Sequence, residues 1–442
     1  MKATFFAVLP MVLALSVHAQ EADANQTPTS DVASAPPTLV GQQAQTQPLS
    51  ELNGSNYLTG GIAITQVYTD NAELSSAGRV HDLSYDLEPN LTLSHAATRL
   101  SYSLGVFAGF VVNRTLNERN QASQTARLDV SYRMAQFTTL RFSERFSNTT
   151  GLWSGSGAGA GYEPTTGIGA LQQPNSALYT FGQFRTNIVL GELSHQFTLN
   201  GVGGVRGTQS FTWFPDAATS PVVGSLYGGQ TYSAEAFYNY RFNPRQWIGA
   251  TLRGQRFDLD RSMGRTDTLS SIFLYGFSIQ PNMSLSFFAG PELSTTAVPQ
   301  ESAPPIPSFS RRMWTPTAGA VFNMQNQRTS ATASYVRGMN DSAGLSSAVT
   351  LSTASATITR QLARFWGFGV NFSYSRGEPI VPSQAIRTYS GSLQLISHLT
   401  SNITVTGGYG RDENAALASG ARASADRVWI SFLCSFLRPL GR

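Results

Sequence analysis

Apolar and polar side chains alternate along most of this chain, so that apolar residues recur at every second position. The run V-W-I-S-F-L-C-S-F, from Val428 to Phe436, shows this repeat, and so does the stretch from Leu83 to Leu93, in which Asp86 and Glu88 occupy the polar parity. A period of two is the repeat of a β-strand, whose successive side chains point to opposite faces. The pattern therefore predicts strands with one face in an apolar medium. We expect a bulge at Pro89, because proline cannot donate a ladder hydrogen bond.

The same alternation recurs to the end of the chain and predicts about 18 strands, with 16 as the alternative count. Lengths of about 10 to 15 residues suit tilted strands that cross a bilayer. The strands are expected over 58–68, 83–93, 98–112, 123–134, 136–147, 179–191, 195–209, 229–242, 245–258, 266–280, 282–294, 312–324, 327–338, 346–360, 363–376, 386–398, 401–411 and 425–437.

The connections between these strands alternate in length. When the predicted strands are counted along the chain, even-numbered strands are followed by short turns, as at Leu193-Ser194 and Gln325-Asn326. Odd-numbered strands are followed by longer loops, including 148–178, 210–228 and 295–311. Short periplasmic turns and long extracellular loops are typical of closed antiparallel barrels in outer membranes. We therefore predict an all-β, antiparallel transmembrane β-barrel over residues 56–442, with both of its ends on the periplasmic side.

The first 55 residues are expected to lie outside the barrel. Residues 1–19 have the features of a signal peptide: Lys2, an apolar core of about 13 residues and the cleavage site Val17-His18-Ala19. Residues 20–55 are rich in Gln, Thr, Ser, Ala and Pro, which predicts a disordered periplasmic tail. No other segment reaches 18 apolar residues, which excludes helical membrane spans. The expected location is the outer membrane of a Gram-negative bacterium, after export through the Sec pathway.

Composition narrows the class of protein further. The chain is 41% hydrophobic and has 40 Gly and 26 Phe, which suits strands that are apolar on one face only. A soluble all-β protein is the alternative. The net charge of +4 is small and dispersed, so nucleic acid is not proposed as a partner. Cys434 is the only cysteine, so no intrachain disulfide can form, and its parity places it on the outward face.

Four short motifs carry a resemblance to a known group of proteins. They are Tyr68-Thr69-Asp70-Asn71, Leu87-Glu88-Pro89-Asn90-Leu91-Thr92-Leu93, Leu128-Asp129-Val130-Ser131-Tyr132 and Leu140-Arg141-Phe142-Ser143-Glu144-Arg145-Phe146. With them the chain resembles Gram-negative outer-membrane β-barrels, and more narrowly the β-barrel porins associated with exopolysaccharide systems. The resemblance covers residues 56–436. The closing segment 437–442 departs from porins that end on a terminal aromatic residue.

This reading implies partners but no cofactor. An outer-membrane barrel contacts outer-membrane lipid and lipopolysaccharide, and is inserted by the barrel-assembly machinery. Periplasmic or exopolysaccharide-export partners and an oligomer are further expectations. A plug domain is not expected, because the 36-residue tail is too short to fold one.

Polar parity supplies candidate pore-lining residues. An arginine-leaning lining would favour anions or polyhydroxylated solutes, because charges close to a permeating ion set its selectivity. The alternative is that these side chains pair across strands and fill a wet interior. The candidates are Asp86, Glu88, Arg127, Asp129, Arg133, Arg141, Arg145, Arg185, Arg206, Glu235, Arg241 and Arg253.

The connection from Asn148 to Ser176 is a candidate constriction loop. Its glycines, among them Gly155, Gly157 and Gly159, make it pliable, and Glu163 is its only charge. Loops of this length are commonly functional, so we expect it to fold into the lumen and narrow the pore. The alternative is a solvent-exposed surface loop.

Catalytic and metal-binding readings find little support. His81 and Asp82 lie near Ser75 and Ser76 in sequence, which is one local cluster without a hydrolase motif. The other histidines of the barrel region lie at predicted turns: His95, His195 and His398. No metal-ligand spacing, phosphate loop or nucleotide fingerprint is present. We expect no enzyme activity, no metal and no cofactor.

The expected function is a porin-like channel for passive diffusion of small hydrophilic solutes, with a leaning toward anions. The alternative is a structural or exopolysaccharide-secretion-associated outer-membrane barrel without general pore activity. A third reading is a surface adhesin that uses the loops 148–178 and 210–228.

Overall fold

The computed structural model describes most of the chain from residue 56 onward. The predicted signal peptide, 1–19, and the predicted periplasmic tail, 20–55, lie outside the described residues. Strands and turns make up the described part, which holds no helix long and apolar enough to cross a membrane. The described ranges are 56–72, 78–116, 120–150, 183–213, 228–259, 264–298, 301–302, 305–306, 309–340, 349–379, 386–416 and 422–440.

Twenty strands are present in these ranges. They are β1 (Asn56–Thr69), β2 (Asp82–Ala96), β3 (Leu100–Asn113), β4 (Gln121–Ala135), β5 (Thr138–Thr150), β6 (Gln183–Gln196), β7 (Gly201–Trp213), β8 (Gly229–Asn243), β9 (Gln246–Leu259), β10 (Gly264–Gln280), β11 (Met283–Val298), β12 (Glu301–Ser302), β13 (Pro305–Ile306), β14 (Phe309–Gln325), β15 (Thr329–Asn340), β16 (Val349–Gln361), β17 (Trp366–Pro379), β18 (Ile386–His398), β19 (Ile403–Ala416) and β20 (Arg422–Pro439).

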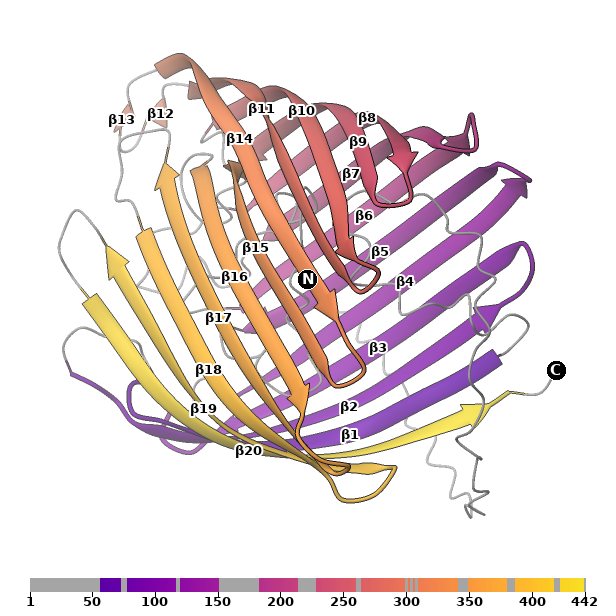
Figure 1. Ribbon diagram of the computed structural model, residues 1–442. Helices are drawn as coiled ribbons and strands as arrows, with labels where there is room; N and C mark the ends of the chain where they lie inside the picture. Colours follow the sequence, from indigo (N-terminus) through magenta and orange to yellow (C-terminus); the bar gives the residue numbers. More distant parts are fainter. Residues whose placement is uncertain are drawn as a thin grey trace, which may run out of the picture. The chain divides into compact units, whose positions relative to one another are not determined.

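Eighteen of these strands form one antiparallel sheet that closes into a barrel. Figure 1 shows them following one another round the wall, from β1 in indigo to β20 in yellow. Closure comes from β1, which pairs with β2 on one side and with β20 on the other. The two remaining strands, β12 and β13, pair only with each other. The predicted count of 18 is confirmed, and the alternative of 16 is wrong.

The two ends of the barrel differ in the length of their connections. Turns of two to four residues follow every even-ranked barrel strand except the last, β20, and define what we call the tight-turn end. The opposite, long-loop end carries the connections after the odd-ranked strands, including the segments 151–182 and 214–227, which lie outside the described residues. The first and last described residues meet at the tight-turn end, where the Leu440 amide donates to the Asn56 carbonyl oxygen over 2.8 Å. The predicted asymmetry of the connections is therefore confirmed.

The barrel wall has two chemically different faces. In β9, Thr251, Arg253 and Gln255 are buried, whereas the intervening Leu252 is 54% exposed. Exposed aromatic and aliphatic side chains such as Phe273 continue this outward row across neighbouring strands, while the buried rows carry mostly Thr, Ser, Asn, Gln and charged residues. This is the arrangement that the alternation in the sequence predicted, with an apolar face outside and a polar face inside.

The predicted outward position of Cys434 is confirmed, since it is exposed and pairs with Ile62 on the outward face. Trp429, in contrast, lies on the inward face and is 8% exposed. Its ring covers Gly408 of the neighbouring strand, where any Cβ would collide with it.

Two prolines interrupt ladders without shifting their register, and a third lies where a ladder ends. The predicted bulge at Pro89 is wrong: β1 pairs with β2 continuously through Ile62 and Pro89, and only the ladder to β3 misses residues 88 and 89. Pro291 likewise lies in a gap of the β10–β11 ladder. The strands are paired in the same register on both sides of each gap, because a proline removes one hydrogen-bond donor and leaves the spacing along the strand unchanged.

The third proline, Pro316, lies where β14 and β15 separate. Their ladder runs only from Gln325 and Ser330 to Ala318 and Arg337. Beyond it, β14 pairs with β11 alone over residues 309–317, and β15 pairs with β16 alone over 338–340. Extended in register, the ladder would place Met339 opposite Pro316, which has no N–H to donate. The wall is therefore joined between β14 and β15 only in the half nearer the tight-turn end.

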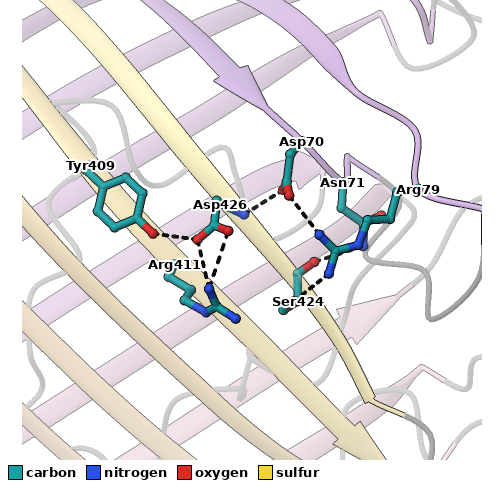
Figure 2. A network of polar contacts seen from close by, with 7 residues as sticks. All are labelled: Asp70, Asn71, Arg79, Tyr409, Arg411, Ser424 and Asp426. Atoms are coloured by element: carbon teal, nitrogen blue, oxygen red, sulfur yellow. Dashed lines mark hydrogen bonds and ion pairs between the residues drawn. The ribbon is translucent and has the colours of Figure 1, made fainter.

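A polar network fastens the closing seam at the long-loop end, as Figure 2 shows. The Asp426 amide of β20 donates to Asp70 Oδ1 over 2.7 Å, and Arg79 Nη1 reaches Asp70 Oδ2 over 3.0 Å. On the other side of the seam, Tyr409 Oη and Arg411 Nη1 of β19 reach the Asp426 carboxylate over 2.6 and 3.4 Å. One carboxylate from each end of the barrel sequence thus ties together β1, β19 and β20.

Candidate functional site

A row of alternating charges crosses the inner wall at one level. Arg141 of β5, Glu192 of β6 and Arg206 of β7 are direct cross-strand partners. The same row continues through β8 to β11, and we call the whole row the charge ladder. Its members in order are Arg141, Glu192, Arg206, Glu235, Arg253, Ser270 and Glu292.

Arg206 lies between two carboxylates of the charge ladder. Its Nε lies 3.0 Å from Glu192 Oε2, and its Nη1 lies 3.3 Å from Glu235 Oε2. The side chain is 6% exposed, and its guanidinium stacks 5.7 Å from the centre of the Phe237 ring. Two carboxylates therefore neutralise one buried arginine, which gives it no excess charge to offer a solute.

The charge ladder ends beside the separation of β14 and β15. Arg253 and Glu292 are both fully buried, with 3.5 Å between Nη2 and Oε1. Glu292 Oε2 also accepts hydrogen bonds from Thr317 and from the Met339 amide, the latter over 3.1 Å. The amide of Met339 thus bonds to an inward carboxylate in place of a strand partner. The chain after Arg337 is held against the inner wall of β11.

On the tight-turn side of the charge ladder, an apolar cluster lies on the inner wall of β8 to β15. Phe237, Ile272, Leu274, Phe288 and Val336 are buried and contact one another, with Trp247 packed against them. The side chains of this cluster are buried, as are those of Arg206, Arg253 and Glu292 in the charge ladder.

The solvent-accessible charges of the inner wall are concentrated on β4 and β5. Arg127 and Arg145 are direct cross-strand partners, and Arg141 lies opposite Ser131. The side chains of Arg127 and Arg141 are 30% and 35% exposed, and Arg133 is exposed as well. Asp129 is the only inward carboxylate of these two strands and binds Arg127. We call Arg127, Arg133, Arg141 and Arg145 the basic face.

Eleven of the twelve predicted pore-lining residues lie on the inner face of the barrel. Most of them fall into two groups, the charge ladder and the basic face. Arg206, Glu235 and Arg253 belong to the charge ladder, and Arg141 belongs to both groups. Asp86 and Glu88 lie inward on β2 and are separated from the basic face by β3, which has no charged residue. Arg241 lies inward near the tight-turn end of β8. Their role as a lining remains a prediction.

Arg185 was assigned to the wrong face. It pairs with Asn148 and Trp213, on the same side of β6 as the outward-facing Leu193. Its Nε reaches Asn148 Oδ1 over 3.4 Å on the outer surface. The run Ile188-Val189-Leu190 is apolar on both parities, so period two does not distinguish the faces of this strand.

Sequence reasoning also missed inward charges, among them Glu192, Glu292, Arg427 and Asp412. Glu192 lies one residue beyond the predicted strand end at 191, because the turn is at 197–200 and not at Leu193-Ser194. Glu292 lay inside a predicted strand, on the parity of the buried Ser286 and Phe288, so parity was the signal for it. Arg427 is two residues from the inward-facing Trp429 and therefore also faces inward, where its Nε donates a hydrogen bond to Asp412 over 2.9 Å.

The predicted constriction-loop residues Gly155, Gly157, Gly159 and Glu163 lie outside the described residues. So do Ser75 and Ser76 of the histidine cluster. The Asp82 carboxylate accepts hydrogen bonds from the backbone amides of Leu83 and Thr115, each over 2.8 Å, which gives it a structural role. Within the described ranges, no group of three His, Cys, Asp or Glu residues could hold a metal ion.

Comparison with known proteins finds similar solved structures only. No family model and no curated protein matches the chain. Pseudomonas aeruginosa OccK2 (OpdF) in complex with glucuronate is 10% identical, with a TM-score of 0.44 over 86% of this chain and 98% of that chain. The P. aeruginosa outer membrane protein OpdK is 8% identical, with a TM-score of 0.43 over 86% and 99%. OpdK with vanillate is 9% identical, with a TM-score of 0.42 over the same shares. Such distant likeness assigns this chain neither a solute nor a membrane.

Proposed function

We propose that this barrel is an outer-membrane channel through which small hydrophilic solutes diffuse passively. The observation that carries the proposal is the two-faced wall. Large apolar side chains, including Phe110, Phe273 and Leu393, are exposed on the outward rows of separate strands, while the inward rows are mostly polar. A soluble barrel would leave this apolar band in water, at a cost of about 25 cal/mol per Å². A bilayer removes that cost, and 18 strands leave room for an aqueous lumen.

Within that channel, we propose a preference for anionic solutes, which the basic face supports. Four arginines and one carboxylate face inward on β4 and β5, and the accessible ones are positioned to meet a solute. The rest of the charge ladder adds no positive charge, since its two further arginines, Arg206 and Arg253, are compensated by its three glutamates. A guanidinium offers a planar pair of donors that suits carboxylate or phosphate oxygens.

The location follows from the same proposal. The tight-turn end would face the periplasm and the long-loop end the exterior, which is the usual orientation of such barrels. Export by the Sec pathway, insertion by the barrel-assembly machinery, contact with lipopolysaccharide and oligomer formation belong to this proposal. The alternative is an export barrel that serves an exopolysaccharide system and conducts only with its periplasmic partners.

Planar-bilayer recording of the refolded full chain under a salt gradient tests the proposal. We expect steady channels with a reversal potential of the sign for anion preference. Steady channels without ion preference would remove the role of the basic face and keep the channel. Silence from a protein that circular dichroism shows to be folded β-sheet would contradict the channel and favour the partner-dependent export barrel.

A further inference from the structure

Three arginines lie in one row on the outward face near the long-loop end. Arg337 of β15 is the direct partner of Ser352 of β16, which is the partner of Arg376 of β17. Arg376 in turn lies opposite Arg387 of β18. Adjacent strands are about 4.8 Å apart, so the three guanidinium groups start from Cα positions within about 15 Å. We call Arg337, Arg376 and Arg387 the arginine row.

Charge in the arginine row is not balanced by the protein. Glu378 binds two members, Arg376 closely and Arg337 over 3.9 Å between Nη2 and Oε2. Glu413, opposite Tyr389, is the next carboxylate on this face. Arginines outnumber carboxylates even when both glutamates are counted. Like charges directly opposite each other destabilise a sheet, so the pair Arg376 and Arg387 calls for a further anion.

Unused donors point to the same conclusion. The Nε atoms of Arg337, Arg376 and Arg387 are each buried and without a hydrogen-bond partner. A buried donor without a partner costs about 1 to 3 kcal/mol, and more when it is charged. The side chains of Arg337 and Arg376 are nevertheless 38% and 40% exposed, so their outer nitrogens remain accessible from outside the barrel.

An aromatic row lies directly below the arginine row, toward the tight-turn end. Tyr335 and Tyr374 flank Ala354, and Tyr389 lies opposite Tyr374 with 5.1 Å between the ring centres. Phe372 and Leu393 continue the outward face below them. Tyrosine is enriched at the boundary between lipid tails and headgroups. The arginine row is therefore at headgroup level in the leaflet at the long-loop end.

From these observations we propose that the arginine row binds the phosphomonoester headgroup of a lipid in that leaflet. A phosphomonoester carries about −1.5 to −2 charges near neutral pH and accepts several hydrogen bonds at once. Three arginines with Glu378 as their bound carboxylate leave an excess of two positive charges, which such a group would balance. Its acyl chains would lie along the aromatic row and the apolar side chains below it. The inference rests on the membrane location of the proposed function, but not on the passage of solutes.

Native mass spectrometry of the folded full chain in neutral detergent tests the proposal. The probes are dioleoyl phosphatidic acid, dioleoyl phosphatidylcholine and inorganic phosphate. We expect the protein to retain phosphatidic acid over phosphatidylcholine and to lose about fivefold in affinity for each arginine removed, up to R337Q/R376Q/R387Q. The matched control is Arg411→Gln, an outward arginine on β19 that already binds Asp426, and it should keep the preference.

Two outcomes would overturn the proposal. One is an unchanged preference for phosphatidic acid in the triple variant, and the other is its displacement by an equal concentration of inorganic phosphate. Heat-modifiable electrophoretic mobility shows that each variant is folded, and bilayer conductance is recorded in parallel. Lost lipid binding with normal conductance supports the lipid site, whereas lipid binding without conductance contradicts only the channel.

Discussion

Arg253 and Glu292 form a fully buried ion pair on the inner wall, with 3.5 Å between Nη2 and Oε1. The guanidinium of Arg253 makes no hydrogen bond, while Glu292 Oε2 accepts hydrogen bonds from Thr317 and the Met339 amide. The glutamate therefore compensates the arginine and also holds the displaced end of β15 against β11. A charge buried without its partner is far more costly than a polar residue that was never charged.

We expect Glu292→Gln to destabilise the barrel by about 3 to 5 kcal/mol, because it leaves the Arg253 guanidinium buried and uncompensated. Combining Glu292→Gln with Arg253→Met should recover most of that loss. Urea unfolding, followed by tryptophan fluorescence, measures both. The control is Arg256→Gln, which breaks the exposed pair with Asp267 and should change stability by less than about 1 kcal/mol. Equal effects of Glu292→Gln and Arg256→Gln would contradict the burial argument.

The basic face is expected to set the ion preference of the channel. Replacing Arg141 and Arg145 by glutamine should lower the anion-to-cation permeability ratio by a factor of about two to five, since each exposed charge acts on a nearby ion with about 1 kcal/mol or less. The reversal potential in a salt gradient measures the ratio. Arg185→Gln is the matched control, because this arginine is on the outward face of β6 and should leave the ratio unchanged. A shift as large in Arg185→Gln would refute the assignment of faces.

At the seam between the first and last strands, Asp70 is expected to matter more than its ion-pair partner. Asp70→Ala removes the acceptor of the Asp426 amide and of Arg79, at a cost of about 1 to 2 kcal/mol. Arg79→Gln removes only the exposed ion pair, since the Arg79 side chain is 55% exposed, and should cost less than about 1 kcal/mol. Hydrogen exchange at the Asp426 amide should accelerate in Asp70→Ala alone. Equal acceleration in both variants would show that the ion pair, not the amide bond, fastens the seam.

The sequence was sufficient for the parts of the barrel in which each strand has one clear apolar face. The stretches Leu83–Leu93 and Val428–Phe436 sort their side chains without ambiguity, and both have the faces that were predicted. The predicted turn positions were wrong where consecutive residues are all apolar, so that neither face of the strand stands out, as at Ile188-Val189-Leu190. There the strand boundary moved by several residues and Arg185 was placed on the wrong face.

Which side chains are partners across the barrel could not be predicted from the sequence, for a different reason. Alternation tells which way a side chain points, but it does not tell which rung lies opposite which. The pairing of Arg253 with Glu292 skips β10, where Ser270 occupies the same rung, so no local spacing announces it. Pro316 was visible in the sequence, yet its effect depends on Met339 being the residue opposite.

Thiol modification during bilayer recording tests most directly whether a water-filled lumen is bordered by the basic face. Ser143 lies inward on β5 between Arg141 and Arg145, and Cys434 lies on the outward face of β20. In the variant Ser143→Cys with Cys434→Ser, a water-soluble anionic methanethiosulfonate should change the single-channel current and should react faster than its cationic analogue. The wild-type chain, with Cys434 alone, should keep its current. A current that is unchanged in the Ser143→Cys variant, or changed equally through Cys434, would contradict the account.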